Sequence, residues 1–181
     1  MEHDFNLYWI DMKYIRNLQN KDKRVYSVSP QKGKQNRPYL GVLVLLHGQK
    51  YCIPLSKVKN KYLNMKDHID FSRIIVDDEV IAGLNFSRMI PVEIAQLSKA
   101  DLKIRKRDNS EVKRRKEAYK KELNWCNKNK RIIIDKANVL YEKYISGEKF
   151  GRKKDCLNFP ELEDVCKKYN NKKETSSPLE S

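Results

Sequence analysis

The fold of this chain is decided by residues 39–55, which read YLGVLVLL at 39–46, HG at 47–48 and QKYCIPL at 49–55. Two apolar, β-prone runs flank a connection that contains glycine, and this pattern predicts an antiparallel β-hairpin. Pro54 has no N–H to donate to a strand ladder, so the second strand is expected to end there or to lie at a sheet edge.

Outward from the hairpin, further short strands are predicted at residues 5–10, 71–76, 80–81 and 89–94. Asp11 is a candidate cap for a short helix that follows the first of these strands. Several short strands separated by frequent breakers are typical of a compact, strongly bent antiparallel sheet or partial barrel.

Beyond residue 98 the pattern changes to helix. Apolar residues recur on one face of a predicted helix around 112–126, a second helix is predicted at 132–145, and a third begins at Pro160. The chain is therefore predicted to be α+β, with its helices concentrated in the C-terminal half.

The length of 181 residues favours one domain. We expect it to span residues 1–169, strand-rich over 1–98 and helix-rich over 99–169. Residues 170–181 are polar and are predicted to form a disordered tail. Residues 19–37 carry few apolar side chains and are predicted to form a long basic loop.

The net charge is +15, from 39 Lys and Arg against 24 Asp and Glu. Such a surplus indicates a polyanionic partner, because each basic side chain placed near a phosphate releases a condensed counterion. Enzymes of small metabolites seldom need it, since it repels itself in the compact state. Residues 99–136 alone hold 15 basic against 6 acidic side chains, a surplus of +9. The charge narrows the partner to a nucleic acid or an anionic membrane.

A membrane is the weaker choice. No apolar run approaches the ~20 residues that a spanning helix needs, and the N-terminus lacks the pattern of a secretory signal. The helix at 105–123 has a modest apolar face that suits packing better than a lipid surface. We therefore expect a cytoplasmic protein without membrane contact.

No metal or cofactor is expected. The three histidines stand at positions 3, 47 and 68, and the four cysteines at 52, 126, 156 and 166, without metal-ligand spacing. A phosphate-binding loop, a dinucleotide fingerprint and a nucleophile elbow are also missing from the sequence.

Two basic segments are the candidates for RNA contact, one in the predicted loop and one along the predicted basic helix. For any single lysine an ordinary solvated position is the simpler interpretation, but the helix stretch as a whole points to nucleic acid. The candidate residues are Lys21, Lys23, Arg24, Lys32, Lys34, Asn36, Arg105, Lys106, Arg107, Lys113, Arg114, Lys116 and Lys120.

A hydroxyl and two ammonium groups follow the second strand of the hairpin, at Ser56, Lys57 and Lys59. Cleavage of RNA without metal requires an oriented 2′-hydroxyl, a cation on the phosphate oxygens and a proton for the leaving oxygen. Lys and Ser side chains can meet these needs, and Arg37 precedes the neighbouring strand. From composition alone, an ordinary solvated turn explains the same residues.

Five segments in order resemble the ToxN/AbiQ family of type III toxin–antitoxin endoribonucleases, including its CptN-like branch. The segments are YWIDMKYI at 8–15, RPYLGV at 37–42, KYCIPLSKVK at 50–59, GLNFSRMIPV at 83–92 and CLNF at 156–159. The resemblance covers roughly residues 8 to 169.

The resemblance implies a bent antiparallel sheet related to the MazF and Kid toxins, with added helices. It implies metal-independent cleavage of cellular or phage RNA that leaves a 2′,3′-cyclic phosphate. It also implies inhibition by a small pseudoknotted antitoxin RNA that the toxin cuts from its precursor, a cyclic protein–RNA assembly, and a role in phage defence.

Carried over by position, Ser56 matches the catalytic hydroxyl of the family, Lys59 a lysine of its motif, and Arg37 a basic residue near the scissile phosphate. Lys57 departs from the pattern, because relatives commonly carry a second serine there. Whether Lys57 adds a cation to the site or points at the RNA backbone stays open at this stage. Tyr14 and Tyr39 are candidates for either the site or the core, and Tyr39 is assigned to the core.

The alternative function is a non-catalytic basic RNA-binding module. It predicts tight, salt-dependent RNA binding without any cleavage product.

Overall fold

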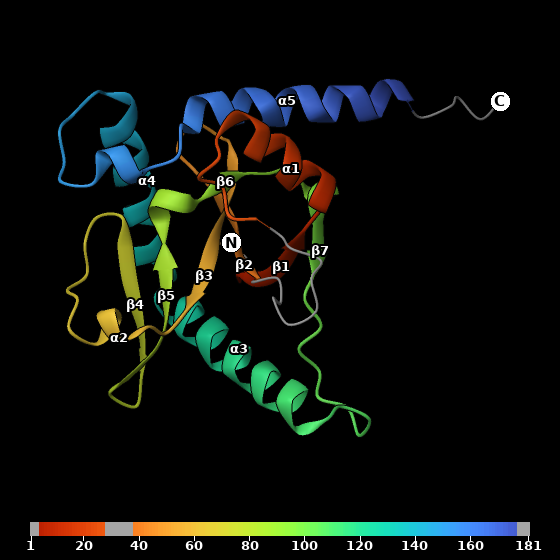
Figure 1. The fold of residues 1–181 in the computed structure, drawn as a ribbon, viewed down its shortest axis with the longest axis vertical. Helices are drawn as coiled ribbons and strands as arrows, with labels where there is room; N and C mark the ends of the chain where they lie inside the picture. Colours follow the sequence, from red (N-terminus) through yellow and green to blue (C-terminus); the bar gives the residue numbers. More distant parts are fainter. Residues whose placement is uncertain (1–3, 28–37, 177–181) are drawn as a thin grey trace.

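The computed structural model describes residues 4–27 and 38–176, with side chains up to Lys172. Figure 1 shows one sheet with helices around it. In chain order the strands are β1 (Asn6–Ile10), β2 (Tyr39–Val44), β3 (Lys50–Lys57), β4 (Phe71–Val76), β5 (Glu79–Asn85), β6 (Ile90–Pro91) and β7 (Leu97–Lys99). The α-helices are α1 (Met12–Lys21), α2 (Asn60–Leu63), α3 (Ser110–Lys128), α4 (Lys130–Ile145) and α5 (Phe159–Ser176), and three short 3₁₀ helices lie at Phe86–Arg88, Ile94–Gln96 and Lys153–Asp155.

The predicted hairpin at residues 39–55 is confirmed. Tyr39 pairs with Pro54 and Val44 with Lys50, in antiparallel register. Gly48 closes the turn with a φ of 87°, in the left-handed region that a residue with a side chain rarely adopts. Beyond Pro54 the strand continues to Lys57, because its other edge pairs with β5 there.

The seven strands form one open antiparallel sheet in the order β4-β5-β3-β2-β1-β7, and β6 pairs with the free part of β3. Over the residues that the structure describes, β4 and β7 are the two ends, and the sheet does not close into a barrel. The fold class is therefore α+β, as predicted, with β3 at the centre of the sheet.

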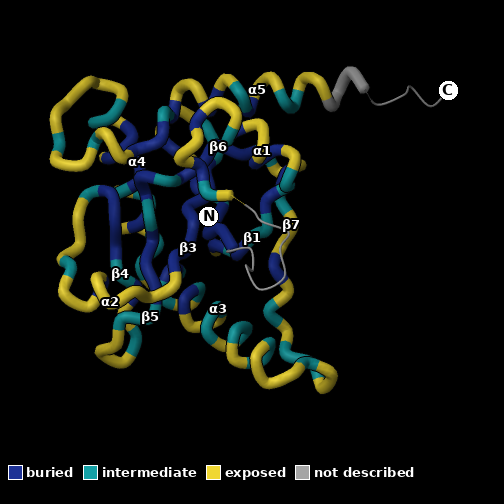
Figure 2. Tube along the Cα trace, viewed as in Figure 1, coloured by how far each residue is buried: buried dark blue, intermediate teal, exposed yellow. Residues whose placement is uncertain are grey.

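Helices cover the sheet on several sides. α1 packs beside α5, and α3 packs against β4 and β5. The central strands are buried along most of their length, whereas the helices expose one face to solvent (Figure 2). Leu40, Ile53 and Leu84 are completely enclosed in the core that these layers share. Burial of such apolar side chains stabilises the fold by about 1.5–3 kcal/mol each.

Several predicted boundaries are wrong. The predicted strand at 89–94 reduces to Ile90–Pro91, and β7 was not predicted because Leu97–Lys99 has no β-prone run and is held by pairing with β1. The four-residue helix α2 was also not predicted. Of the five α-helices that the structure describes, α1, which was predicted after Asp11, and α2 lie before residue 98, and α3, α4 and α5 lie after it.

Two segments predicted to be irregular are partly helical. α1 continues to Lys21, into the predicted loop at 19–37. α5 runs to Ser176, into the predicted tail at 170–181. The Asn170 side chain contacts Gln96 and donates to the backbone carbonyl of Cys166, so tertiary contact extends the helix beyond its polar sequence. No helix in the described ranges is long and apolar enough to cross a membrane.

Candidate active site

The end of β3 and the N-cap of α2, which follows it directly, carry three of the four residues predicted to be catalytic. Ser56 pairs with Gly83 of β5 and is 2% exposed, and Lys57 pairs with Ala82 and is exposed. Lys59 is exposed at the N-cap of α2 and accepts a backbone hydrogen bond from Tyr62 at 2.7 Å. The strand end therefore combines an enclosed hydroxyl with two exposed ammonium groups. Arg37, the fourth predicted residue, lies outside the described residues.

Ser56 and Lys57 project from opposite faces of the sheet, because successive side chains of a strand alternate. The register places Ser56 on the face of Pro54, Gly83 and Tyr39. Lys57 lies on the other face, and its charge acts on Glu122 of α3. The structure thus brings the two residues to one strand end but separates their side chains.

The face of Ser56 is covered next to its partner Gly83. A Cβ at Gly83 would lie 2.5 Å from the Phe71 ring and 3.5 Å from Tyr62. The Phe71 and Tyr62 rings pack together with their centroids 4.7 Å apart. A glycine is required at position 83 because the aromatic pair fills the space in which a side chain would stand.

A network of polar side chains continues along the same face. Asn85 follows Gly83 by two residues, so it shares this face, and its amide donates to the Tyr26 hydroxyl at 2.8 Å. The Arg88 guanidinium lies 5.8 Å from the centre of the Tyr26 ring and donates to the carbonyl of Arg24 at 2.9 Å. Sequence analysis did not single out Asn85, Tyr26 or Arg88, because no local spacing links a loop residue to the end of β5.

Tyr14 and Tyr39, which the sequence offers for either the site or the core, both lie in the interior of the protein. Tyr14 is fully buried and donates to the carbonyl of Pro91 at 2.6 Å, so it is a core residue. Tyr39 is 3% exposed, and its hydroxyl has no hydrogen-bond partner among the residues that the structure describes. Burial raises the pKa of Tyr39, so its phenol stays protonated. Its burial agrees with the core assignment, and its position places it on the face of Ser56.

Glu122 is a residue that sequence analysis missed. It is 7% exposed and lies on the inward face of α3, three residues after Tyr119 and four before Cys126. Burial raises the pKa of Glu122 to about 8, and the positive charge of Lys57 opposes this shift. A carboxylate within the apolar stripe of a helix was the signal that could have found it.

The predicted RNA-binding residues fall into three groups. The ammonium and guanidinium groups of Lys21, Arg24, Arg105 and Lys116 are engaged in ion pairs with Glu161, Asp22, Asp101 and Asp108. Lys113 is half-buried, and Lys23, Lys106, Arg107, Arg114 and Lys120 are exposed. Lys32, Lys34 and Asn36 lie outside the described residues, as Arg37 does.

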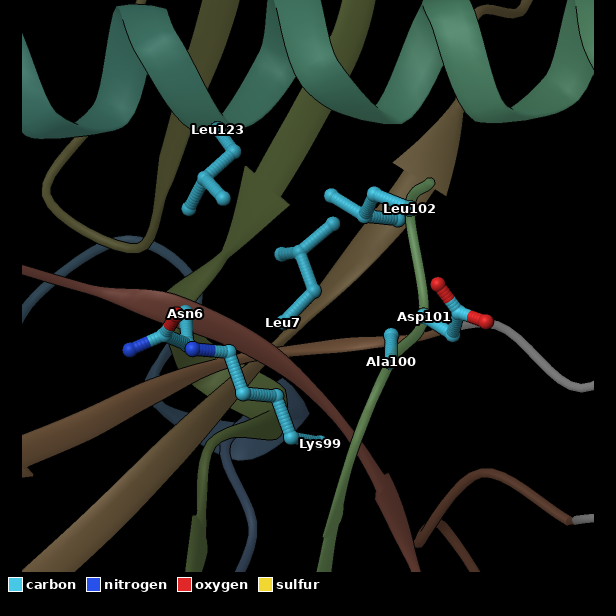
Figure 3. A pocket seen from close by; sticks show the side chains of 7 residues that line it. All are labelled: Asn6, Leu7, Lys99, Ala100, Asp101, Leu102 and Leu123. Carbon is cyan, nitrogen blue, oxygen red and sulfur yellow. The ribbon is translucent and has the colours of Figure 1, made fainter. Parts of the chain in front are cut away.

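Two surface hollows lie away from the strand end. One, of about 410 Å³, lies between β1, the segment after β7 and α3, and Leu7, Leu123 and the neighbouring Asp101 and Leu102 are among its lining residues (Figure 3). The other, of about 310 Å³, lies between α1 and α5 and includes Lys21 among its lining residues. Among the predicted site residues that the structure describes, Lys21 is the one that lines either hollow.

Comparison with known proteins shows which family the chain belongs to. The family model described as "Toxin ToxN, type III toxin-antitoxin system" matches residues 6–167. The chain belongs to the ToxN family. The resemblance inferred from the five sequence segments is therefore confirmed.

Individual ToxN relatives agree with this assignment. Endoribonuclease ToxN of Bacillus thuringiensis subsp. kurstaki is 24% identical over 165 residues, which cover 88% of this chain and 81% of the relative. The solved structure of AbiQ, a lactococcal anti-phage endoribonuclease of a type III system, is 22% identical with a TM-score of 0.78, over 93% of this chain and 99% of AbiQ. A toxin of a type III system that a non-coding RNA pseudoknot inhibits is 21% identical with a TM-score of 0.75, over 93% and 99% of the two chains.

Proposed function

We propose that this ToxN-family toxin cleaves RNA without a metal ion, at the end of β3, by attack of a 2′-hydroxyl on the adjacent phosphorus. As a member of the ToxN family, the chain is an endoribonuclease toxin of a type III toxin–antitoxin system. The mechanism, the residue roles and the 2′,3′-cyclic phosphate product are the proposal. The observation that carries it is that the enclosed Ser56 stands at the end of β3 and is followed by the exposed Lys57 and Lys59.

In this mechanism Ser56 and Lys59 orient the attacking hydroxyl and the phosphate. The 2′-hydroxyl loses its proton as its oxygen bonds to phosphorus, and the bond from phosphorus to the 5′-oxygen breaks, so that this oxygen takes up a proton and leaves as a hydroxyl. A near-attack geometry of this kind is worth several kcal/mol of the barrier, because the reacting atoms are already aligned. Arg37 neutralises the charge that develops on the non-bridging oxygens, and Lys57 adds to this with a side chain long enough to turn around the strand end. Of these cations, Lys57 and Lys59 are exposed and can meet a phosphate from solvent.

We also propose that the inhibitor is a small pseudoknotted antitoxin RNA and that the substrates are cellular or phage RNA. The support is the pseudoknot that inhibits one structural neighbour, the processed non-coding RNA of a bacterial antiviral system in another, and the anti-phage role of AbiQ. A closed cyclic protein–RNA assembly, a cytoplasmic location and kinship of the sheet with the MazF and Kid toxins belong to the same proposal.

The test is cleavage of RNA in excess chelator by the wild type and by Ser56→Ala and Lys59→Ala variants. We expect wild-type cleavage to survive the chelator, and each variant to lose roughly 10²–10³-fold in rate while still binding RNA. Lys61→Ala is the matched control, because it removes an exposed lysine from α2, two residues beyond Lys59. A requirement for magnesium, or full activity of Ser56→Ala, would refute the mechanism.

Membership of the ToxN family replaces the non-catalytic RNA-binding alternative. Ser56 is 2% exposed, so a bound RNA meets the two lysines more readily than the hydroxyl. If Ser56 only shapes the RNA-binding surface, Ser56→Ala would bind RNA with the same salt dependence and still release product in the same assay. The product is therefore the discriminating measurement.

A further inference from the structure

The hollow between α1 and α5 is lined mostly by polar and basic side chains. Its volume is about 310 Å³. The two helices pack side by side along the top of Figure 1, whereas α2, which follows the end of β3 directly, lies in the lower part of the view. The hollow is therefore separate from the proposed cleavage site.

Three lysine side chains give the hollow a positive charge. Lys21 comes from α1, and Lys168 and Lys172 come from α5, one helical turn apart. All three are exposed, and no carboxylate is among the described residues that line the hollow. Lys21 pairs with Glu161 at 3.6 Å, and both side chains are about half exposed. Because solvent screens such a pair, a phosphate can replace the carboxylate.

The remaining polar groups of the hollow are suited to an unpaired nucleobase. Asn17 and Asn20 of α1 carry primary amides, which can donate to and accept from the edge of a base. The Asn17 amide is fixed on the helix surface, since it donates to the carbonyl of Lys13 at 2.8 Å. The half-buried Tyr169 ring packs against the buried Tyr14 ring, with the centroids 5.1 Å apart. A ring braced in this way loses little conformational entropy when a base stacks on it.

α5 is anchored where it carries these groups, although its sequence there is polar. Asn170 contacts Gln96 and donates to the carbonyl of Cys166 at 2.9 Å. The Tyr169 hydroxyl lies 3.5 Å from the carboxylate of Asp11, the N-cap of α1. The lysines and the ring of α5 therefore lie on a helix that is held against the rest of the protein.

We propose that the hollow between α1 and α5 is a second RNA-contact site, which binds a single-stranded segment of RNA. Lys21, Lys168 and Lys172 contact its phosphates. The Tyr169 ring stacks on one of its bases, and the amides of Asn17 and Asn20 meet the base edge. This inference rests on the RNA-binding part of the proposed function and adds a site that the cleavage mechanism does not use.

The side chains of the hollow favour a single strand over other polyanions. A duplex keeps its bases stacked on one another, so it would use the lysines but not the Tyr169 ring. An acidic peptide would likewise match only the charge. Single-stranded RNA uses both kinds of group, because a basic groove follows its backbone while aromatic side chains stack on its unpaired bases.

The test compares the binding of single-stranded RNA, duplex RNA and poly-glutamate, each followed by fluorescence anisotropy at several salt concentrations. The single strand is 2′-O-methylated, so it cannot be cleaved through its 2′-oxygen. A double variant, Lys168→Gln with Lys172→Gln, should bind the single strand roughly tenfold more weakly than the wild type. Its slope of log K against log salt should become shallower by about 1.4, because each phosphate contact to a single strand contributes about 0.7.

Two single substitutions separate stacking from charge. Tyr169→Leu should weaken binding of the single strand about fivefold or more and leave the salt slope unchanged, because it removes a stacking contact and no phosphate contact. Lys167→Gln is the matched control, since Lys167 is exposed on α5 but does not line the hollow, and it should bind like the wild type. Circular dichroism of each variant separates loss of fold from loss of the contact. If Tyr169→Leu unfolds, the double lysine variant decides the test, because it changes exposed side chains only.

Equal affinity and salt slope in the double variant and in Lys167→Gln would overturn the inference. A loss as large for the duplex or for poly-glutamate as for the single strand would also overturn it, since it would show a contact by charge alone. In either case the proposed function stands if the wild type cuts RNA in excess chelator and Ser56→Ala does not. If the wild type neither binds nor cuts RNA, both proposals fail.

Discussion

A buried carboxyl should make the stability of this toxin fall as the pH rises, and Glu122→Gln should remove that effect. Glu122 is 7% exposed, and burial raises its pKa from 4.5 to about 8, with the charge of Lys57 opposing the shift. Below pH 4.5 the carboxyl is neutral in the folded and unfolded states. Between 4.5 and about 8 the unfolded state releases the proton while the folded state keeps it, so stability is lost over this window.

The size of the effect follows from the pKa change. Each tenfold change in a proton affinity is worth 1.36 kcal/mol, so Glu122 should cost about 5 kcal/mol of folding free energy between the two ends of the window. Urea unfolding followed by tryptophan fluorescence measures this, since Trp125 lies on the same helix. The difference in unfolding free energy between Glu122→Gln and the wild type should move by that amount in favour of the variant as the pH rises.

The comparison with Glu117→Gln isolates burial as the cause. Glu117 is exposed on α3, so its replacement should leave the pH dependence of stability unchanged. The reasoning is refuted if Glu122→Gln and the wild type differ by the same free energy at both ends of the window. A loss of fold in the variant at every pH would instead show that the carboxyl itself is needed for packing.

Two further substitutions test the hydrogen bonds of Asp22 and the packing of the Phe71 ring against Gly83. Asp22→Asn should lower the free energy of unfolding by about 2 kcal/mol near neutral pH and by little near pH 2. Burial raises the pKa of the Asp22 carboxyl, but hydrogen bonds from Arg24 and Asn158 outweigh burial and lower the pKa from 3.8 to about 2. That stabilisation is present above pH 3.8 and lost as the pH falls through about 2, and an unchanged acid-unfolding curve would contradict it. Gly83→Ala should cost about 1–3 kcal/mol and lower the thermal midpoint, because the new methyl group meets the Phe71 ring at 2.5 Å. A calorimetric midpoint equal to that of the wild type would mean that the ring moves away freely.

The hairpin at residues 39–55 could be predicted because its signal is local. β-prone runs and the glycine turn lie within one short segment, and the same interactions fix them in the fold. β7 and the end of α5 could not be predicted, because distant partners hold them. Leu97–Lys99 becomes a strand through its register with β1, and α5 is extended by contact with Gln96.

The candidate site was predictable in part for the same reason. The family pattern located Ser56, Lys57 and Lys59, and the structure places all three at one strand end. The family pattern could not show that Ser56 and Lys57 face opposite sides of the sheet, because this depends on β3 staying paired beyond Pro54. Glu122 was hidden within a helix whose charge drew attention to its outer face.

The two faces of α3 carry different charged groups. Ion pairs occupy some of the predicted RNA-binding cations, such as Lys116, which donates to Asp108 at 2.8 Å and is 14% exposed. Arg114 and Lys120 are exposed on the same helix, so we expect RNA to meet its outer face. The inner face carries Glu122, whose pKa burial raises to about 8. RNA bound along the outer face would add negative charge near α3 and so disfavour the ionisation of Glu122 further.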